Sequence, residues 1–329
     1  MKDKIRVVHY GISHDHSTST LATARKYPDI YEIVGVCEPN DAVREARGKD
    51  KAYDGLPWLT EEELFSRNDI DAAFCEGYEL ESVAQAQKCI DHGLHVHLDK
   101  PGGTDLDAFA KLLHDAKDRG LTLQMGYMFR YNPAMQYVLR KVREGALGTI
   151  TSIDATFCCL HDAEKRSWMG AFPGGNMFFL GCHSIDMILL INGLPQSVHA
   201  FNRASGFGSG NALDSAFAVL DYPTGVATVR ANATESSGYQ RRTLRVVGTE
   251  GVIEIRPLES PTVVREATRK HAMETGWRDS TDGVFPGFIP GRYDEMMLDF
   301  ARCVRGEKQN PYTYEYELEL QRVVLEACK

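Results

Sequence analysis

A lysine at the end of a short apolar stretch is the first residue of this chain whose position suggests chemistry. Residues 94–98 have the pattern of a buried strand, and they lead directly into Asp99-Lys100-Pro101. Ligands of open α/β sheets bind beyond the carboxyl ends of the strands, which is where Lys100 would lie. Pro101 disfavours helical geometry at Lys100 and so holds it on a stiff turn. Lys100 is therefore a candidate functional residue, and a solvated loop lysine is the simpler alternative.

The turn Gly11-Ile-Ser-His-Asp-His16, between a strand and a helix, is a second candidate. A dinucleotide-binding fingerprint has glycines at the positions of Gly11, Ser13 and His16. Gly11 allows the tight turn, and Ser13 is small enough for the backbone to approach a pyrophosphate. His16 is too large for close helix–strand packing. The motif is weak by itself, because an ordinary strand-to-helix turn explains it equally well.

Glu38 follows the second apolar stretch, roughly 20 residues beyond this turn, as the acidic residue of the fingerprint does. A carboxylate at that strand end can accept both ribose hydroxyls of an adenosine and would repel a 2′-phosphate. We therefore expect NAD as the cofactor in preference to NADP. A turn with a solvated acid is the alternative.

Two histidines, His14 and His16, lie where the following helix begins. Their nitrogens, or amides near them, could contact phosphates. An H-x-H pair is also a pattern of zinc ligands, but spacing shows no third ligand. We therefore expect no metal site.

The composition indicates a globular protein that lies inside the cell. It has 43% hydrophobic and 25% charged residues, and it lacks an apolar run long enough to cross a membrane. The net charge of −9 argues against a nucleic-acid surface. None of the eight cysteines forms a C-x-x-C pair, so we expect neither a disulfide framework nor a structural zinc site. With no apolar signal region at the N-terminus, the expected location is the cytoplasm.

The elements that must position these residues change character along the chain. Residues 1–123 alternate short apolar strands with helical stretches, which predicts a doubly wound parallel sheet of the Rossmann type. The predicted strands are Ile5–Tyr10, Tyr31–Cys37, Ala72–Cys75 and residues 94–98 and 121–126. The predicted helices are residues 17–27, Ala42–Arg47, 60–66, 80–92 and 105–119.

Residues 124–329 predict a second α/β domain with a large, mostly antiparallel open sheet. Its strand candidates are separated by glycine-bearing turns. They are residues 149–159, 197–207, 214–220, 225–235, 242–247, 252–256 and 261–266. Helical periodicity returns at residues 296–305 and 316–328, and these helices could pack back on the first domain.

Several segments together resemble the glucose–fructose oxidoreductase / inositol dehydrogenase / MocA family of nicotinamide-dependent oxidoreductases. The resemblance spans nearly the whole chain. It is carried by residues 11–16, 71–78, 84–101, 126–133, 144–150, 174–186 and 248–255. The segment 95–101 matches the family's E-K-P loop, with Asp99 in place of glutamate.

The resemblance implies hydride transfer between a nicotinamide and a hydroxyl-bearing carbon of a sugar or polyol. Lys100 matches the lysine that contacts the nicotinamide ribose and the substrate hydroxyl, and His183 matches the acid/base histidine. An imidazole can take the hydroxyl proton near pH 7, and an ammonium stabilises the developing alkoxide. The family's open sheet often forms the oligomer contact, so we expect a homo-oligomer, either a dimer or a tetramer.

Further site residues follow from position. The loop after the fourth strand and the altered E-K-P loop add Gly77, Tyr78 and Asp99 to the cofactor candidates, which are Gly11, Ser13, His14, His16, Glu38 and Lys100. Candidates for contact with a carbohydrate-like substrate lie at the domain junction or in and near the segment 174–186. They are Tyr127, Arg130, Asn132, Trp168 and Asp186.

The chain departs from the family pattern at positions that bear on activity. Phe179 occupies the position of the aspartate four residues before His183, and a phenyl ring cannot orient an imidazole. Asp186, three residues after His183, would share a helix face with it and matches an aspartate that the family often has there. Glu76-Gly77-Tyr78 replaces the family's usual Ala/Thr-Thr-Pro. Two alternatives therefore stay open: an NAD-retaining glycoside hydrolase or lyase that oxidises its substrate transiently, and a binding or sensor protein without turnover.

Overall fold

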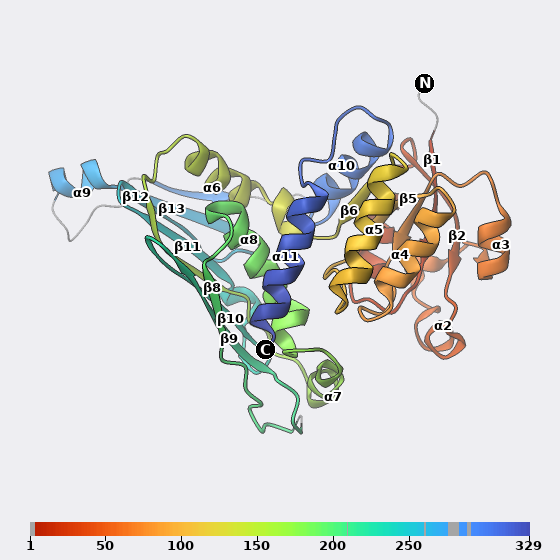
Figure 1. Cartoon of the computed structure of the whole chain (residues 1–329), viewed down its shortest axis with the longest axis horizontal. Helices are drawn as coiled ribbons and strands as arrows, with labels where there is room; N and C mark the ends of the chain where they lie inside the picture. The colour runs from red at the N-terminus through yellow and green to blue at the C-terminus, as the bar shows by residue number, and fades with distance from the viewer. Residues whose placement is uncertain (1–3, 209, 260, 276–282, 288–290) are drawn as a thin grey trace. The chain divides into compact units, whose positions relative to one another are not determined.

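The structure, a computed structural model of the chain, describes residues 4–208, 210–259, 261–275, 283–287 and 291–329. The chain divides into two compact units, whose elements are labelled in Figure 1. The first unit comprises Met1–Met128 and Gly291–Gln321, and the second comprises Phe129–Pro290 and Arg322–Lys329. The division after residue 128 lies close to the predicted boundary after residue 123. A later stretch of the chain therefore belongs to the first unit.

The first unit contains a six-stranded, all-parallel sheet in the order β3-β2-β1-β4-β5-β6. Its strands are β1 (Ile5–Tyr10), β2 (Tyr31–Cys37), β3 (Trp58–Leu59), β4 (Ala72–Cys75), β5 (His95–Leu98) and β6 (Leu123–Met125). The bounds of β1, β2 and β4 are the predicted ones, because strands buried on both faces are continuous apolar runs. The edge strand β3 is missing from the sequence prediction, since two residues carry no periodicity. The Rossmann-type fold of this unit is confirmed.

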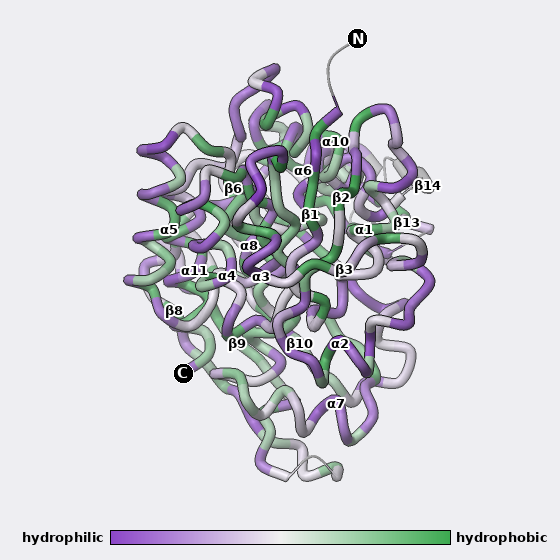
Figure 2. Tube along the Cα trace, turned by 90° about the vertical axis from the view of Figure 1, so that its right-hand side faces the viewer, coloured by the Kyte–Doolittle hydropathy of each residue, from purple (hydrophilic) through white to green (hydrophobic). Residues whose placement is uncertain are grey.

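Helices cover both faces of this sheet. They are α1 (Ser17–Arg25), α2 (Asp41–Arg47), α3 (Glu61–Ser66), α4 (Ser82–Asp91), α5 (Leu106–Asp118) and α10 (Asp294–Val304). The chain moves in one direction from β1 to β2 and in the other from β4 to β5, so right-handed crossovers place α1 and α4 on opposite faces. Figure 2 shows α5 alternating between hydrophilic and hydrophobic stretches, as an amphipathic surface helix does. The last helix, α11 (Tyr314–Ala327), includes residues of both units.

The second unit contains an eight-stranded sheet in the order β14-β13-β12-β11-β7-β10-β9-β8. Every neighbouring pair is antiparallel except β7 and β10, so the predicted large, mostly antiparallel sheet is confirmed. The strands are β7 (Ile150–Thr156), β8 (Ser197–Ala200), β9 (Ser215–Tyr222), β10 (Gly225–Asn232), β11 (Thr243–Gly248), β12 (Gly251–Ile255), β13 (Thr262–Thr268) and β14 (Gly283–Gly287). The predicted strand 197–207 is wrong beyond Ala200, where β8 ends. After it, the amide of Phe201 donates to the carbonyl of Phe217, and Arg203 forms an isolated bridge with Ser215.

Helices of the second unit pack along one face of this sheet (Figure 1). They are α6 (Pro133–Arg143) and α8 (Cys182–Asn192). The short α7 (Ala163–Trp168) follows β7 in the chain, and the short α9 (Arg269–Thr275) follows β13. A single π-helical turn, Met177–Gly181, precedes α8 directly. Such turns are rare and occur often at functional sites. Every residue of Cys182–Ile191 except Leu190 is buried, so α8 is the central helix of this unit.

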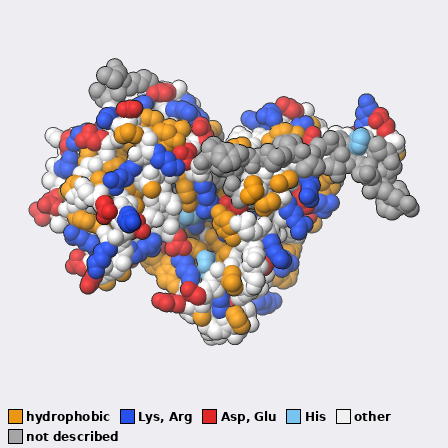
Figure 3. Space-filling view, turned by 180° about the vertical axis from the view of Figure 1, so that it is seen from behind, with side chains coloured by type: hydrophobic (Ala, Val, Ile, Leu, Met, Phe, Trp, Pro, Cys, Tyr) orange, Lys and Arg blue, Asp and Glu red, His pale blue; other side chains and the backbone are white. Residues whose placement is uncertain are grey.

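Three further features concern the charged surface, the cysteines and the length of the helices. In the face seen in Figure 3, side chains of both charge signs are interspersed over the first unit. All eight cysteines are buried free thiols. Among the described residues, no helix combines the length and the apolar character that a membrane crossing requires.

Candidate functional site

The switch point of the first sheet brings three loops together. The strand order reverses between β1 and β4, and in parallel sheets ligands bind outside the carboxyl ends of the strands at such a point. Residues 11–16 follow β1, residues 76–79 follow β4 and residues 99–101 follow β5. Most cofactor candidates chosen from the sequence lie in these loops.

Two glycines let the first two loops touch. Gly11 has φ +81°, and a Cβ on it would lie 2.5 Å from Cα of Gly77. A Cβ on Gly77 would in turn meet Oε1 of Gln85 at 1.8 Å. The amide of His14 donates to the carbonyl of Glu76 at 2.9 Å, which fastens the turn to the neighbouring loop. Position 11 therefore requires glycine for this close approach, whereas a side chain at Gly77 would have to displace the end of the Gln85 side chain.

The three loops bring His14, His16 and Asp99 into contact, and we call these residues the His–Asp cluster. Nδ1 of His14 lies 3.1 Å from Oδ2 of Asp99, and Nδ1 of His16 lies 2.9 Å from the same oxygen. The amide of His16 donates to Nδ1 of His14 at 3.1 Å. The Asp99 carboxylate also accepts the amide of Lys100 at 2.7 Å. The H-x-H pair noted in the sequence thus has a third potential ligand, 83 residues from His16.

Two further carboxyl groups, absent from the site prediction, lie beside the His–Asp cluster. Oε2 of Glu76 is 3.6 Å from Nδ1 of His14, and Oε1 of Glu79 is 3.5 Å from Nε2 of the same ring. Both glutamates are buried. Their position directly after the fourth strand was the one available signal, because it placed them at the same sheet edge as the histidines.

The surroundings of Asp99 and Glu76 shift the pKa values of these two acids in opposite directions. Burial alone would raise the pKa of Asp99, but the imidazoles of His14 and His16 outweigh it and hold that pKa well below its usual value. Burial, and then repulsion from Asp99, raise the pKa of Glu76 well above its usual value. Burial lowers the pKa of His16 to about 4 despite the attraction of Asp99. The pKa values of these two neighbouring carboxyls are thus shifted in opposite directions, as expected for groups that compete for one charge.

Lys100 lies where the sequence placed it, directly after β5. Its side chain is only 1% exposed, which is unusual for a lysine. The peptide bond between Lys100 and Pro101 is cis. The solvated-lysine alternative is therefore wrong for this structure.

Glu38 directly follows β2 and supports the glycine turn. Its Oε2 accepts the amide of Ile12 at 2.8 Å and its Oε1 accepts the amide of Asn40 at 2.9 Å. Burial raises the pKa of Glu38, although these two bonds oppose the rise. Arg47, which the sequence did not single out, donates to the carbonyls of Ser13 and His14. Tyr78, the remaining candidate of this unit's loops, is half-buried, and its carbonyl accepts the amides of Glu81 and Ser82 as α4 begins.

In the second unit, His183 lies on the first turn of α8. Its buried ring packs against Phe129 and Phe157, with ring centroids 5.4 and 5.1 Å away. Phe179, in contrast, contacts Trp168 and Phe172. The π turn between the two positions changes the helical phase, so Phe179 and His183 belong to different side-chain clusters.

Asp186 pairs with Arg130 inside the same unit. Nε of Arg130 lies 3.1 and 3.0 Å from the two carboxylate oxygens, and Nη2 lies 2.8 Å from Oδ1. Each side chain is 1% exposed. These two candidates for substrate contact are thus engaged with each other in the structure.

The other substrate candidates have local contacts. The side chain of Asn132 caps α6 by accepting the amides of Ala134 and Met135. Trp168 is half-buried, and the ammonium of Lys165 lies 3.6 Å from its ring centroid. Tyr127 is buried in the first unit. None of these contacts tests the proposed substrate roles, which stay predictions.

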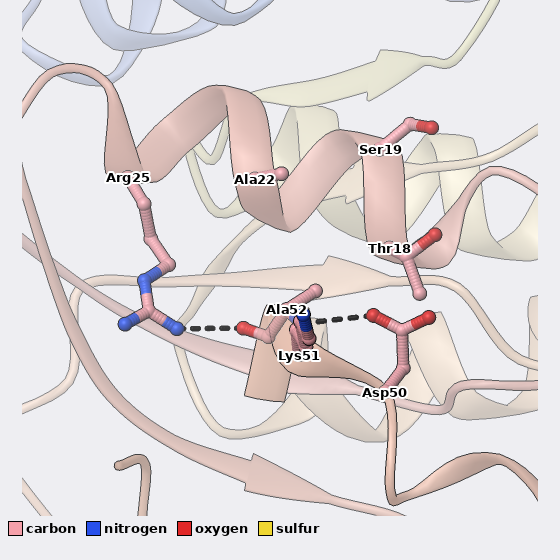
Figure 4. A pocket seen from close by; sticks show the side chains of 7 residues that line it. All are labelled: Thr18, Ser19, Ala22, Arg25, Asp50, Lys51 and Ala52. Carbon is pink, nitrogen blue, oxygen red and sulfur yellow. Dashed lines mark hydrogen bonds between the residues drawn. The ribbon is translucent and has the colours of Figure 1, made fainter. Parts of the chain in front are cut away.

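An open pocket of about 510 Å³ lies on the exposed side of α1, away from the buried face of that helix. Figure 4 shows its lining, in which the guanidinium of Arg25 donates to the carbonyl of Ala52 at 2.6 Å. The carboxylate of Asp50 accepts a hydrogen bond from the amide of Ala52, so this acidic side chain caps a turn. We therefore place the candidate site at the strand ends and not in this pocket.

Comparisons with known proteins bear on both units. The family model described as the GFO/IDH/MocA C-terminal domain matches residues 135–254, inside the second unit. A D-xylose 1-dehydrogenase (NADP(+)) from Haloferax volcanii is 27% identical over 80% of this chain and 77% of its own length. A 2,7-anhydro-N-acetylneuraminate hydratase from Escherichia coli is 27% identical over 49% of this chain and 45% of its own.

Solved structures share the fold of the whole chain. A levoglucosan dehydrogenase in complex with NADH and levoglucosan superposes with a TM-score of 0.81 at 16% identity, over 99% of this chain and 96% of that one. An all-parallel six-stranded sheet, a second unit built on a mostly antiparallel sheet, and the match of that unit to the family model agree with one another. Residues 135–254 of the chain thus match the C-terminal domain of the GFO/IDH/MocA family, and the whole chain has the fold of the levoglucosan dehydrogenase structure.

Proposed function

We propose that the chain is an NAD-dependent oxidoreductase that transfers a hydride between nicotinamide and a hydroxyl-bearing carbon of a sugar, a polyol or a related compound. The observation that carries this proposal is the position of Gly11, Glu38 and Lys100. All three follow strands of one parallel sheet, at the edge where its order reverses. This is where such sheets bind dinucleotides.

The residues of this edge fit a dinucleotide. Gly11, with its positive φ, brings the backbone of the turn close to the space outside the strand ends. Each oxygen of Glu38 accepts one backbone amide, and a carboxylate oxygen has a second lone pair for a ribose hydroxyl. Its negative charge would repel a 2′-phosphate, which supports NAD over NADP. Once bound, the nicotinamide would supply or accept the hydride.

The chain's own groups would handle the proton. In our proposal, His183 takes the hydroxyl proton during oxidation and returns it during reduction. Lys100 stabilises the alkoxide that develops on the substrate oxygen. Burial favours both roles, because charge interactions strengthen where water is excluded. The relatives named for xylose and levoglucosan support a polyhydroxylated substrate.

A second candidate function keeps the cofactor and changes the outcome. In an NAD-retaining lyase or glycoside hydrolase, transient oxidation of the substrate acidifies a neighbouring C–H. The relative named as a hydratase favours this possibility, because its named reaction is not a net oxidation. Tight retention of NAD without net formation of NADH would identify it. A sensor without turnover, motivated by Phe179, would bind ligand and show neither activity.

Calorimetric titration with NAD and with NADP, after removal of co-purified nucleotide, tests the proposal. We expect NAD to bind more tightly than NADP. Glu38→Gln keeps an acceptor for the Ile12 amide and should weaken NAD binding about 10- to 100-fold, as for hydrogen bonds to a charged group. Glu32→Gln, at the exposed end of the same strand, is the matched control and should bind NAD as the wild type does. Failure of both nucleotides to bind would overturn the proposal.

We also propose that the chain forms a homo-oligomer through the open face of the second sheet. Residues along β9 alternate between buried and half-buried, so one face of the sheet is turned away from the core. On β10, Val226 is 43% exposed. Arg230 covers the Phe217 ring at 4.8 Å. Light scattering coupled to gel filtration should give the mass of a dimer or tetramer. Val226→Lys should shift the measured mass toward that of the monomer. A monomer at all concentrations would refute this.

A further inference from the structure

We propose that the His–Asp cluster is a binding site for one divalent first-row transition-metal ion, with Zn²⁺ as the simplest occupant. The cluster consists of His14, His16 and Asp99, and one ligand atom of each lies within 4.8 Å of the others. This site does not depend on the nucleotide proposal, and either can hold without the other.

The distances between donor atoms suit a single ion. The nitrogens of His14 and His16 lie 3.1 and 2.9 Å from one oxygen of Asp99. Glu76 offers a fourth donor, 3.6 Å from the same His14 nitrogen. With metal–ligand bonds of about 2.0–2.2 Å, neighbouring ligand atoms lie about 2.8–3.6 Å apart in octahedral or tetrahedral coordination. The cluster can therefore surround an ion with little rearrangement.

The hydrogen bonds assign a ligand-competent form to His14. Its Nδ1 accepts the amide of His16, so this nitrogen carries a lone pair and the proton lies on Nε2. The same nitrogen lies 3.1 Å from Oδ2 of Asp99, so a cation placed between them could take both atoms as ligands in place of the amide contact. On the other side of the ring, Nε2 points to the carboxylate of Glu79 at 3.5 Å. Ligand histidines commonly direct their second ring nitrogen to a carboxylate in this way.

Glu76 supplies an independent indication of a missing ligand. Its side chain is 0% exposed, and neither carboxyl oxygen has a hydrogen-bond partner among the described residues. A buried polar group without such a partner is costly, and most buried polar groups avoid that state. An ion held by the cluster would give one of these oxygens a partner, because Oε2 faces the ring of His14.

The donor types select the class of ion. Two imidazoles with carboxylates suit Zn²⁺, Fe²⁺ or Co²⁺, whereas Mg²⁺ and Ca²⁺ prefer oxygen ligands alone. We therefore expect no competition from a large excess of Mg²⁺.

Titration of the metal-free full-length chain with Co²⁺, followed by visible absorption, tests the site. We expect one Co²⁺ per chain, displaced by one Zn²⁺. Asp99→Asn and His16→Asn should each weaken binding by at least 100-fold. Glu79→Gln, which leaves all proposed ligands in place, should weaken it about 10- to 100-fold. Circular dichroism of each variant separates loss of the site from loss of the fold.

His114→Asn provides the matched control. His114 is an exposed surface histidine whose Nδ1 lies 3.3 Å from Asp118 on α5, and its loss should leave the stoichiometry unchanged. Equal Co²⁺ binding by the wild type, Glu79→Gln and His16→Asn would overturn the proposal. It would also be overturned if the wild type bound no Co²⁺, or if His114→Asn abolished Co²⁺ binding. NAD titration of the metal-free and metal-loaded chains then separates the fate of this site from that of the nucleotide site.

Discussion

The ion pair between Arg130 and Asp186 allows a quantitative prediction. Replacing Asp186 by Asn removes one charge and leaves a buried guanidinium without its counter-ion. We expect α8, the helix that carries His183, to lose local stability. Because Arg130 directly follows Phe129, whose ring contacts His183, the pair links the histidine's helix to one of its packing partners.

The size of the effect follows from the geometry of the pair. Three nitrogen–oxygen contacts of 2.8, 3.0 and 3.1 Å join side chains that are each 1% exposed. Removing one partner of such a buried pair costs about 3–5 kcal/mol, since the remaining charge is neither solvated nor paired. That range corresponds to about two to four powers of ten in an equilibrium constant for local opening.

Hydrogen exchange measured by mass spectrometry on peptides covering Cys182–Asn192 reports this opening directly, so it does not need two-state unfolding of the whole chain. We expect exchange of Asp186→Asn to be about 10²- to 10⁴-fold faster in these peptides. Glu254→Gln is the control, because it breaks a more exposed pair with Arg265 at 3.6 Å in the same unit. A contribution of about 0–1 kcal/mol is typical of such pairs.

The double variant Arg130→Met/Asp186→Leu separates charge from packing. Removing both partners leaves no buried charge, so exchange should return toward the wild-type rate. If Asp186→Asn exchanges no faster than Glu254→Gln, the pair does not hold α8. If the double variant is as fast as the single one, the loss is one of packing, and the charge argument fails.

Three further predictions concern the first unit and catalysis. Burial, and then repulsion by His97, lower the pKa of His9 to about 3. As the pH drops below about 6.5, His9 therefore takes up a proton in the unfolded chain but not in the folded one, and the free energy of unfolding falls. In urea unfolding, the free energy of unfolding of His9→Gln should fall by about 2 kcal/mol less than that of the wild type between pH 7.5 and 5. An equal fall in both proteins would refute this prediction. Gly11→Ala should abolish calorimetric NAD binding, because its Cβ would lie 2.5 Å from Gly77 at a φ of +81°; unchanged affinity would show that the turn is not needed. Lys100→Met and His183→Asn should each lower kcat about 10²- to 10³-fold in a polyol and sugar panel, and near-normal kcat in either would remove that residue from the proposed chemistry.

Much of the fold follows from local patterns in the sequence. The strands Ile5–Tyr10, Tyr31–Cys37 and Ala72–Cys75 begin and end as predicted, because each is a short apolar run buried on both faces. Helix bounds differ mainly where a polar residue caps the end. Asp105, predicted as helical, instead accepts the amides of Asp107 and Ala108 as the N-cap of α5. The order of strands and helices also placed Lys100 and Glu38 at strand ends.

The composition of the site depends on contacts that spacing along the chain does not reveal. His14 and His16 meet Asp99 because β1, β4 and β5 lie side by side, and this pairing is set by the packing of whole strands. In the same way, Asp186 shares a helix face with His183, as predicted, but its partner Arg130 is 56 residues away. Local propensity determines which residues form strands, helices and turns. Only the tertiary structure decides which of their polar side chains are buried together, because that depends on the burial and pairing of groups far apart in the chain.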